Sequence, residues 1–263
     1  MPRKVINYVE LAYEDVGAGI PIVCIHGHPF NQSMWWPQVE ALQSNFRVIT
    51  FDLRGYGQSL LNNNTVTFQD YALDTLALMD ELQIEAAVIM GLSMGGQIAQ
   101  EVWYQSPTRV GALVLADTFA SLDLPARKQD RYTTADRLLA EGMEPYAYET
   151  LPKMVCPATI QYQPEVAQHV LDMMLTTPPI GAATALRARA ERRDYTYFLG
   201  DINVPTLITV GTEDAFTPIS DAQFMHERIP YSQLLVVENA GHMPNLEQPV
   251  VFNQALADFL ACL

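Results

Sequence analysis

Basic side chains are scarce in this sequence of 263 residues. It has 15 Lys and Arg residues against 30 Asp and Glu, which gives a formal net charge of −15 with the five histidines neutral. A nucleic-acid binder needs a basic face that displaces counterions from phosphates, whereas an acidic surface repels them. The same charge opposes docking on an anionic membrane. The composition therefore excludes nucleic acid and membrane lipid as expected partners.

Long apolar runs are also missing. No segment approaches the roughly 18 apolar residues that a membrane-spanning helix requires. The first seven residues, Met1 to Asn7, are mixed in polarity and lack the apolar stretch of a secretion signal. We therefore expect a soluble, cytoplasmic protein.

Cysteine is rare, and its three positions are Cys24, Cys156 and Cys262. An odd number at these spacings fits neither a disulfide framework nor a zinc site. We expect buried or incidental thiols. The sequence indicates no metal site and no cofactor.

Hydrophobic residues, by contrast, make up 49% of the chain and charged residues only 17%, which is enough for a large buried core. Apolar runs of strand length alternate with stretches of helical periodicity, such as 68–82, which follows the capping pattern of Thr67 and Asp70. This alternation predicts a mostly parallel α/β sheet. Shorter alternating pieces in 4–16 predict an antiparallel hairpin. The predicted buried strands are 22–25, 47–51, 87–90, 113–116, 206–210 and 234–237.

The stretch from 118 to 200 departs from this alternation. It has no strong strand run, it is rich in proline and arginine, and several helical fragments follow one another. It holds nine of the 15 basic residues and ten of the 30 acids, so most of the negative charge lies elsewhere. We interpret 118–200 as an all-helical insertion into an α/β core formed by 1–117 and 201–263.

The sharpest local motif is Gly91-Leu92-Ser93-Met94-Gly95, between a predicted strand and a predicted helix. A serine at so sharp a turn has strained backbone angles, and glycines two positions away let strand and helix approach. A phosphate-binding turn is the alternative, but the Lys-Ser or Lys-Thr ending and the Gly-x-Gly-x-x-Gly spacing are both missing. Ser93 is therefore the candidate nucleophile.

A serine hydroxyl is a weak nucleophile until a base accepts its proton, so a histidine and an orienting carboxylate should accompany Ser93. His242 follows the last predicted strand, and Asp214 follows the strand at 206–210. Asp117 also follows a strand and is the rival acid. We favour Asp214, because Asp117 opens the helical insertion, where anchoring a loop is the simpler role.

With these residues, the sequence resembles the α/β-hydrolase superfamily over essentially its whole length. The segments 26–29 (His-Gly-His-Pro) and 52–59 look like landmarks of that family, and 185–194 and 241–249 are most similar to bacterial esterases, cofactor-free haloperoxidase-like enzymes and 3-oxoadipate enol-lactonases. The resemblance implies a mostly parallel eight-stranded sheet flanked by helices, with the insertion as a cap (lid) over the active site.

The resemblance also implies an oxyanion hole of backbone N–H groups, one of them from the loop after the third strand. Pro29 has no N–H, so His28 is the expected donor there, and Met94 is the second donor. The expected activity is hydrolysis of a small-molecule carboxylic ester or lactone through an acyl-enzyme. The alternatives are a carbon–carbon bond hydrolase with the same triad and a small-molecule receptor on the same fold. The oligomeric state stays open.

Two further groups of residues lie near the expected site. Residues close to the catalytic loops are expected to wall a substrate pocket: Phe30, Trp35, Trp36, Phe119 and Met243. Six arginines of the insertion either pair with its acids or include one that binds a substrate carboxylate. These arginines are Arg127, Arg131, Arg187, Arg189, Arg192 and Arg193.

Overall fold

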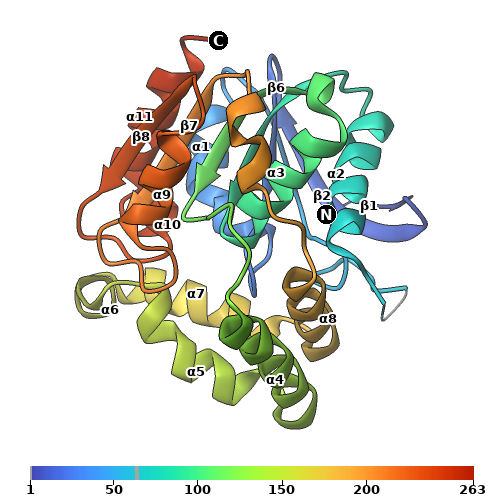
Figure 1. The fold of residues 1–263 in the computed structure, drawn as a ribbon, viewed down its shortest axis with the longest axis vertical. Helices are drawn as coiled ribbons and strands as arrows, with labels where there is room; N and C mark the ends of the chain where they lie inside the picture. Colours follow the sequence, from blue (N-terminus) through green and yellow to red (C-terminus); the bar gives the residue numbers. More distant parts are fainter. Residues whose placement is uncertain (1, 63–64) are drawn as a thin grey trace.

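The computed structural model describes residues 2–62 and 65–263 (Figure 1). Its central sheet has eight strands in the order β1-β2-β4-β3-β5-β6-β7-β8. β2 runs antiparallel to β1 and β4, and the other neighbours are parallel. The strands are β1 (Arg3–Ile6), β2 (Val9–Gly17), β3 (Pro21–Ile25), β4 (Arg47–Phe51), β5 (Ala87–Leu92), β6 (Val110–Ala116), β7 (Thr206–Gly211) and β8 (Ser232–Val237).

The predicted hairpin and the predicted mostly parallel sheet are confirmed. All six apolar runs form strands, with small differences at their ends. The largest is in β6, which begins at Val110, three residues before the predicted run. Gly111 hides this start in the sequence, because glycine has no side chain to extend the apolar pattern.

Both faces of the sheet are covered, which explains why its strands are continuously apolar. In β3, Val23 and Ile25 face one core cluster, whereas Ile22 and Cys24 face the other. The first cluster includes residues of α2, α3 and α9, and the second includes residues of α1 and α11. The helices outside the insertion are α1 (Trp36–Leu42), α2 (Phe68–Glu81), α3 (Met94–Gln105), α9 (Ile219–His226), α10 (Pro244–Glu247) and α11 (Pro249–Leu260), with short 3-10 turns at Gln32–Trp35, Pro107–Arg109 and Thr196–Asp201.

The start of α2 confirms the predicted cap. The Thr67 side chain accepts from the backbone N–H of Asp70, and the Asp70 carboxylate accepts from the backbone N–H of Thr67 at 2.7 Å. This reciprocal pair satisfies two N–H groups that have no partner inside the helix.

Between β6 and β7, the described chain contains helices and no strand. Figure 1 shows α4 to α8 gathered at one end of the molecule, beyond the sheet. Four of these five begin with proline, which fits a first helical turn because the N–H it lacks would have no partner there. We call these five the cap helices: α4 (Pro125–Glu141), α5 (Met143–Met154), α6 (Pro157–Tyr162), α7 (Pro164–Thr176) and α8 (Pro179–Ala190).

The sequence also led to expectations about membrane-spanning segments, cellular location and the state of the cysteines. No helix in the described residues is both long and apolar enough to cross a bilayer. The cytoplasmic location stays a prediction. The three cysteines are free thiols, with Cys24 and Cys156 buried and Cys262 exposed.

Candidate active site

Ser93 lies in the turn that joins β5 to α3. Its backbone has φ 56° and ψ −116°, a left-handed conformation that is strained for a residue with a Cβ. The Ser93 N–H donates to the carbonyl of Ala116 at 2.8 Å, and its carbonyl accepts from the Thr118 hydroxyl at 2.7 Å. Ala116 at the end of β6 and Thr118 just after it thus hold both backbone groups of Ser93. These hydrogen bonds keep the strained turn in place.

The glycines around Ser93 are required by close backbone contacts. A Cβ on Gly91 would lie 2.2 Å from the Gly95 carbonyl oxygen, and a Cβ on Gly95 would lie 2.1 Å from the Ile25 carbonyl oxygen. Neither backbone can yield, so strand and helix approach this closely only with glycine at both positions. This agrees with the steric reason for the sequence motif.

His242 and Asp214 lie together beside this turn. The His242 Nδ1 is 2.7 Å from an Asp214 carboxylate oxygen, and both side chains are buried. The same carboxylate accepts from the Thr217 hydroxyl and from the Phe216 N–H. Burial opposes the ionisation of Asp214, but His242 and these hydrogen bonds outweigh it and lower the pKa of the carboxyl. Asp214 is therefore held as the anion.

Asp117, the rival acid, lies behind this pair. Oxygens of Asp117 and Asp214 and a ring nitrogen of His242 lie within 4.8 Å of one another. However, one Asp117 oxygen accepts from the Gly211 N–H at 2.9 Å, and the other has no hydrogen-bond partner among the described residues. Burial, and then the charge of Asp214, raise the pKa of Asp117 well above its usual value. The structure thus brings His242 to Asp214 and uses Asp117 to anchor β7.

Ser93 and His242 share one cavity of about 350 Å³. Within the described residues they make no direct hydrogen bond to each other, as is common before a substrate tightens such a site. The other residues lining the cavity are His28, Arg127, Asp130, Arg131, Thr134, Tyr146, Thr150, Lys153, Met154, Leu186, Arg189 and Phe216.

His28 is one of the residues that line this cavity. Its Nδ1 lies 2.7 Å from the Tyr56 hydroxyl, and its Nε2 has no partner in the described chain. Burial, followed by the positive charges of Arg189 and Arg131, lowers the pKa of His28 well below its usual value. The imidazole is therefore neutral at neutral pH.

None of the five residues expected to wall the pocket lines it, which corrects that prediction. Phe30, Trp35 and Met243 are fully buried in the core on the α1 side of the sheet. Phe119 is buried beneath the guanidinium groups of Arg127 and Arg192. Trp36 is 53% exposed and lines a separate surface hollow. The prediction failed because it used only proximity in sequence to the candidate catalytic loops. Such proximity does not determine whether a side chain points into the cavity, into the core or toward the surface.

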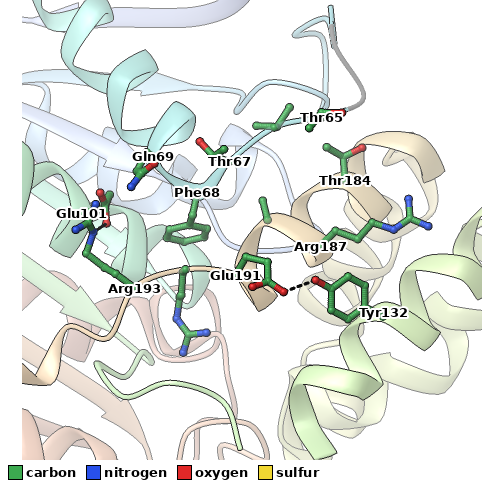
Figure 2. A pocket seen from close by; sticks show the side chains of 13 residues that line it. Thr65, Thr67, Phe68, Gln69, Glu101, Tyr132, Thr184, Arg187, Glu191 and Arg193 are labelled. Carbon is green, nitrogen blue, oxygen red and sulfur yellow. Dashed lines mark hydrogen bonds and ion pairs between the residues drawn. The ribbon is translucent and has the colours of Figure 1, made fainter. Parts of the chain in front are cut away.

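A second and larger cavity, of about 530 Å³, lies on the other side of α8, between that helix and the start of α2 (Figure 2). Neither Ser93 nor His242 lines it. Its charged side chains are paired: Arg193 with Glu101, Arg187 with Asp136, Arg192 with Asp123, and Glu191 with Lys128 and the Tyr132 hydroxyl. The candidate active site is therefore the cavity at Ser93.

Comparison with known proteins agrees with this geometry. A family model for the alpha/beta hydrolase fold matches residues 20–249. The chain belongs to the α/β-hydrolase family. Among solved structures, this α/β hydrolase is similar to a thermophilic esterase from Thermogutta terrifontis, determined with malate bound, at 37% identity and a TM-score of 0.95, covering 99% of this chain and 97% of that chain.

Two lactonases are also similar to this α/β hydrolase. The enol-lactonase from Burkholderia xenovorans LB400 is 29% identical with a TM-score of 0.92, covering 99% of this chain and all (100%) of that chain. The 3-oxoadipate enol-lactonase 1 of Acinetobacter baylyi is 34% identical over 231 residues, which are 88% of this chain and 84% of that protein. The predicted resemblance to esterases and enol-lactonases of the α/β-hydrolase superfamily is confirmed.

Several residues that line the cavity of this α/β hydrolase were not predicted from its sequence. Tyr146, Thr150 and Met154 come from α5, Leu186 from α8, and Phe216 lies 5.1 Å from His242 between ring centroids. The periodicity of α5 and α8 predicts helices but does not say which side of each helix faces Ser93. Phe216 had a usable signal, since it stands two residues after Asp214.

Proposed function

We propose that the protein hydrolyses a carboxylic ester or lactone, with Ser93, His242 and Asp214 as its catalytic triad. The observation that carries the proposal is the 2.7 Å hydrogen bond between His242 and Asp214 beside a serine on a strained strand-to-helix turn. The similar esterase and lactonases act on the same chemical bond, which supports the choice of ester or lactone.

The chemistry proceeds in two halves. The Ser93 oxygen forms a bond to the acyl carbon while His242 accepts the hydroxyl proton, and the protonated His242 then gives that proton to the departing alkoxide. Water next attacks the acyl-enzyme, His242 accepts a proton from it, and the proton returns to Ser93 as the acid product leaves. Asp214 accepts from Nδ1 throughout, so it holds the tautomer in which Nε2 can accept a proton, and it stabilises the imidazolium.

Two backbone N–H groups are proposed to stabilise the tetrahedral oxyanion. Met94 is the first residue of α3, so its N–H has no acceptor within the helix, and the helix dipole adds a positive field at this end. The His28 N–H likewise has no acceptor among the described residues. Donors of this kind stabilise the charge that appears only during reaction. The segment 118–200, which contains the cap helices, is proposed to close over this site.

Replacing the nucleophile tests the proposal. We expect Ser93→Ala to lower kcat on a short aryl ester by roughly 10⁴-fold or more, because the remaining site has no group that can form the acyl-enzyme. Ser106→Ala, at the other end of α3, is the matched control and should keep wild-type rates. Both variants should unfold at the wild-type temperature in circular dichroism.

Two results would count against the proposal. One is a Ser93→Ala variant that retains wild-type turnover. The other is a wild-type protein that reacts only once per active site, as a small-molecule receptor on this fold would, instead of cycling many times.

A further inference from the structure

The cavity at Ser93 is positively charged in a protein that is strongly acidic overall. Four cationic side chains line it, against one carboxylate, that of Asp130. The cations are Arg127, Arg131, Arg189 and Lys153. Charges at a pocket wall act on a ligand at short range, whereas the distant surface carboxylates are screened by salt. The net charge of the chain therefore does not describe this cavity.

Part of this arginine cluster is structural. The buried Asp123 accepts two hydrogen bonds from Arg131, at 2.6 and 2.9 Å, and one from Arg192 at 2.9 Å. Arg192 also donates to the Ser121 carbonyl. These two guanidinium groups thus already have an anion, and they fix the loop before α4 to the end of α8.

Arg189 differs from these two because it has no carboxylate partner in the described chain. It is only 7% exposed, and its one hydrogen bond runs from Nε to the Gln97 side-chain oxygen at 2.6 Å. Its terminal nitrogens donate to no group of the described residues. Burial, together with the charges of Arg131 and Arg192, lowers the pKa of Arg189 well below its usual value. A buried guanidinium without an anion is costly, and an anion in the cavity would relieve that cost.

The position of Arg189 relative to Ser93 follows from Gln97. Gln97 stands one turn after Ser93 in α3, and its N–H donates to the Ser93 carbonyl at 3.1 Å. One helical turn rises about 5.4 Å. The guanidinium of Arg189 is therefore held by a residue one helical turn from Ser93, and Arg189 and Ser93 line the same cavity.

We propose that Arg189 forms a carboxylate-binding subsite in the Ser93 cavity, and that the preferred ester or lactone carries a free carboxylate a short carbon chain away from its reacting carbonyl. Arg127 is the second cation of the subsite. It lies 3.5 Å from Asp123, donates to the Phe216 carbonyl, and is 42% exposed at the cavity wall. The planar guanidinium of Arg189 suits a carboxylate, because two parallel N–H groups can bind its two oxygens. This proposal rests on the proposed hydrolase function.

Matched substrates separate charge from shape. The monoethyl esters of succinic, glutaric and adipic acid are each compared with the ethyl ester in which an amide replaces the free carboxylate. Acid release is followed by pH-stat titration. The wild-type kcat/KM is expected to be at least about tenfold higher on the carboxylate form of the best chain length, since hydrogen bonds to a charged partner exceed those to a neutral one by this order.

Arg189→Gln should abolish this preference, measured as the ratio of kcat/KM on the carboxylate form to kcat/KM on the amide form. Arg127→Gln, at a half-exposed position that tolerates the change, should reduce the preference by a smaller factor. The matched control is Arg187→Gln, which removes a positive charge from the same helix. Arg187 borders the other cavity, on the far side of α8 (Figure 2), and should not affect the preference.

The results separate this inference from the proposed function. If wild-type protein hydrolyses neither these esters nor the short aryl ester, the hydrolase function itself fails. If it hydrolyses the aryl ester but none of the carboxylate-bearing esters, the carboxylate subsite is overturned. If it hydrolyses the amide and carboxylate forms of all three chain lengths equally, the carboxylate subsite is overturned, whether or not Arg189→Gln folds. An equal loss of preference in Arg187→Gln would also overturn it, because the effect would then come from the general field of the protein.

Discussion

Asp117 and Asp214 are two buried carboxyl groups at the ends of neighbouring strands, and their pKa values move in opposite directions. His242 and two hydrogen-bonded neighbours lower the pKa of Asp214, whereas burial and the charge of Asp214 raise that of Asp117. One backbone N–H, from Gly211, is too little to offset the desolvation of Asp117. Asp214 is therefore held as the anion, whereas the fold favours the neutral form of Asp117.

This difference predicts how stability depends on pH. In the folded protein the neutral form of Asp117 is favoured, so ionisation during unfolding makes wild type less stable as pH rises from about 4 through the raised folded-state pKa. Asp117→Asn keeps the neutral form and its oxygen acceptor. As pH rises above about 4, the free energy of unfolding of this variant in urea should therefore increase relative to that of wild type, by at most ~1.4 kcal/mol for each pH unit, until the raised folded-state pKa of Asp117 is passed. A difference that stays constant with pH would contradict this.

The junction of β5 and α3 is the element that positions Ser93, the proposed nucleophile. Its two glycines let the helix begin directly against β3 and β5. Met94, the proposed oxyanion donor, is the first residue of this helix, so one close contact sets the positions of both Ser93 and Met94. A change at this contact should affect folding before it affects chemistry.

Gly95→Ala tests this contact. The new Cβ would lie 2.1 Å from the Ile25 carbonyl oxygen, so we expect it to destabilise the protein. The expected loss of at least about 2 kcal/mol is of the size that overpacking produces. Gly111→Ala in β6 is the control, because its Cβ would meet its nearest neighbour at an ordinary 3.6 Å. Urea unfolding measures both variants, and equal effects would show that the close approach is unimportant.

Across the whole protein, the charge is unevenly distributed: the cap region is nearly neutral, and the remainder carries most of the −15. Repulsion among the carboxylates outside 118–200 destabilises the folded state, and salt screens this repulsion. Raising sodium chloride from about 0.02 to 0.2 M at pH 7 should therefore raise Tm by roughly 2–4 °C, or ~1 kcal/mol. Near pH 5, where partial protonation reduces the net charge, the same step should raise Tm less. A fall in Tm at pH 7 would contradict this.

The local features of this protein could be predicted from its sequence. The turn at Ser93 is determined within five residues, because it requires glycine on both sides, and apolar runs mark strands wherever both faces of a sheet are buried. The parallel order of those strands makes Asp214 and His242 candidates, since their loops leave the same edge. The sequence left Asp117 as a rival for the acid that orients His242. The choice between the two depends on which carboxyl accepts a hydrogen bond from the histidine and which accepts one only from a backbone N–H.

The wall of the cavity was decided only by the tertiary structure. Phe30 and Trp35 pack into the core, whereas Tyr146 and Phe216 reach the cavity, because elements far apart in the chain set the direction in which each side chain points. The same holds for charge. Six arginines look alike in the sequence, but Asp123 is shared by Arg131 and Arg192, and no carboxylate of the described chain reaches Arg189. The sequence by itself determined the fold and the candidate nucleophile, because both depend on local patterns. The packing of the cap helices on the core determined which cation has no carboxylate partner in the cavity at Ser93.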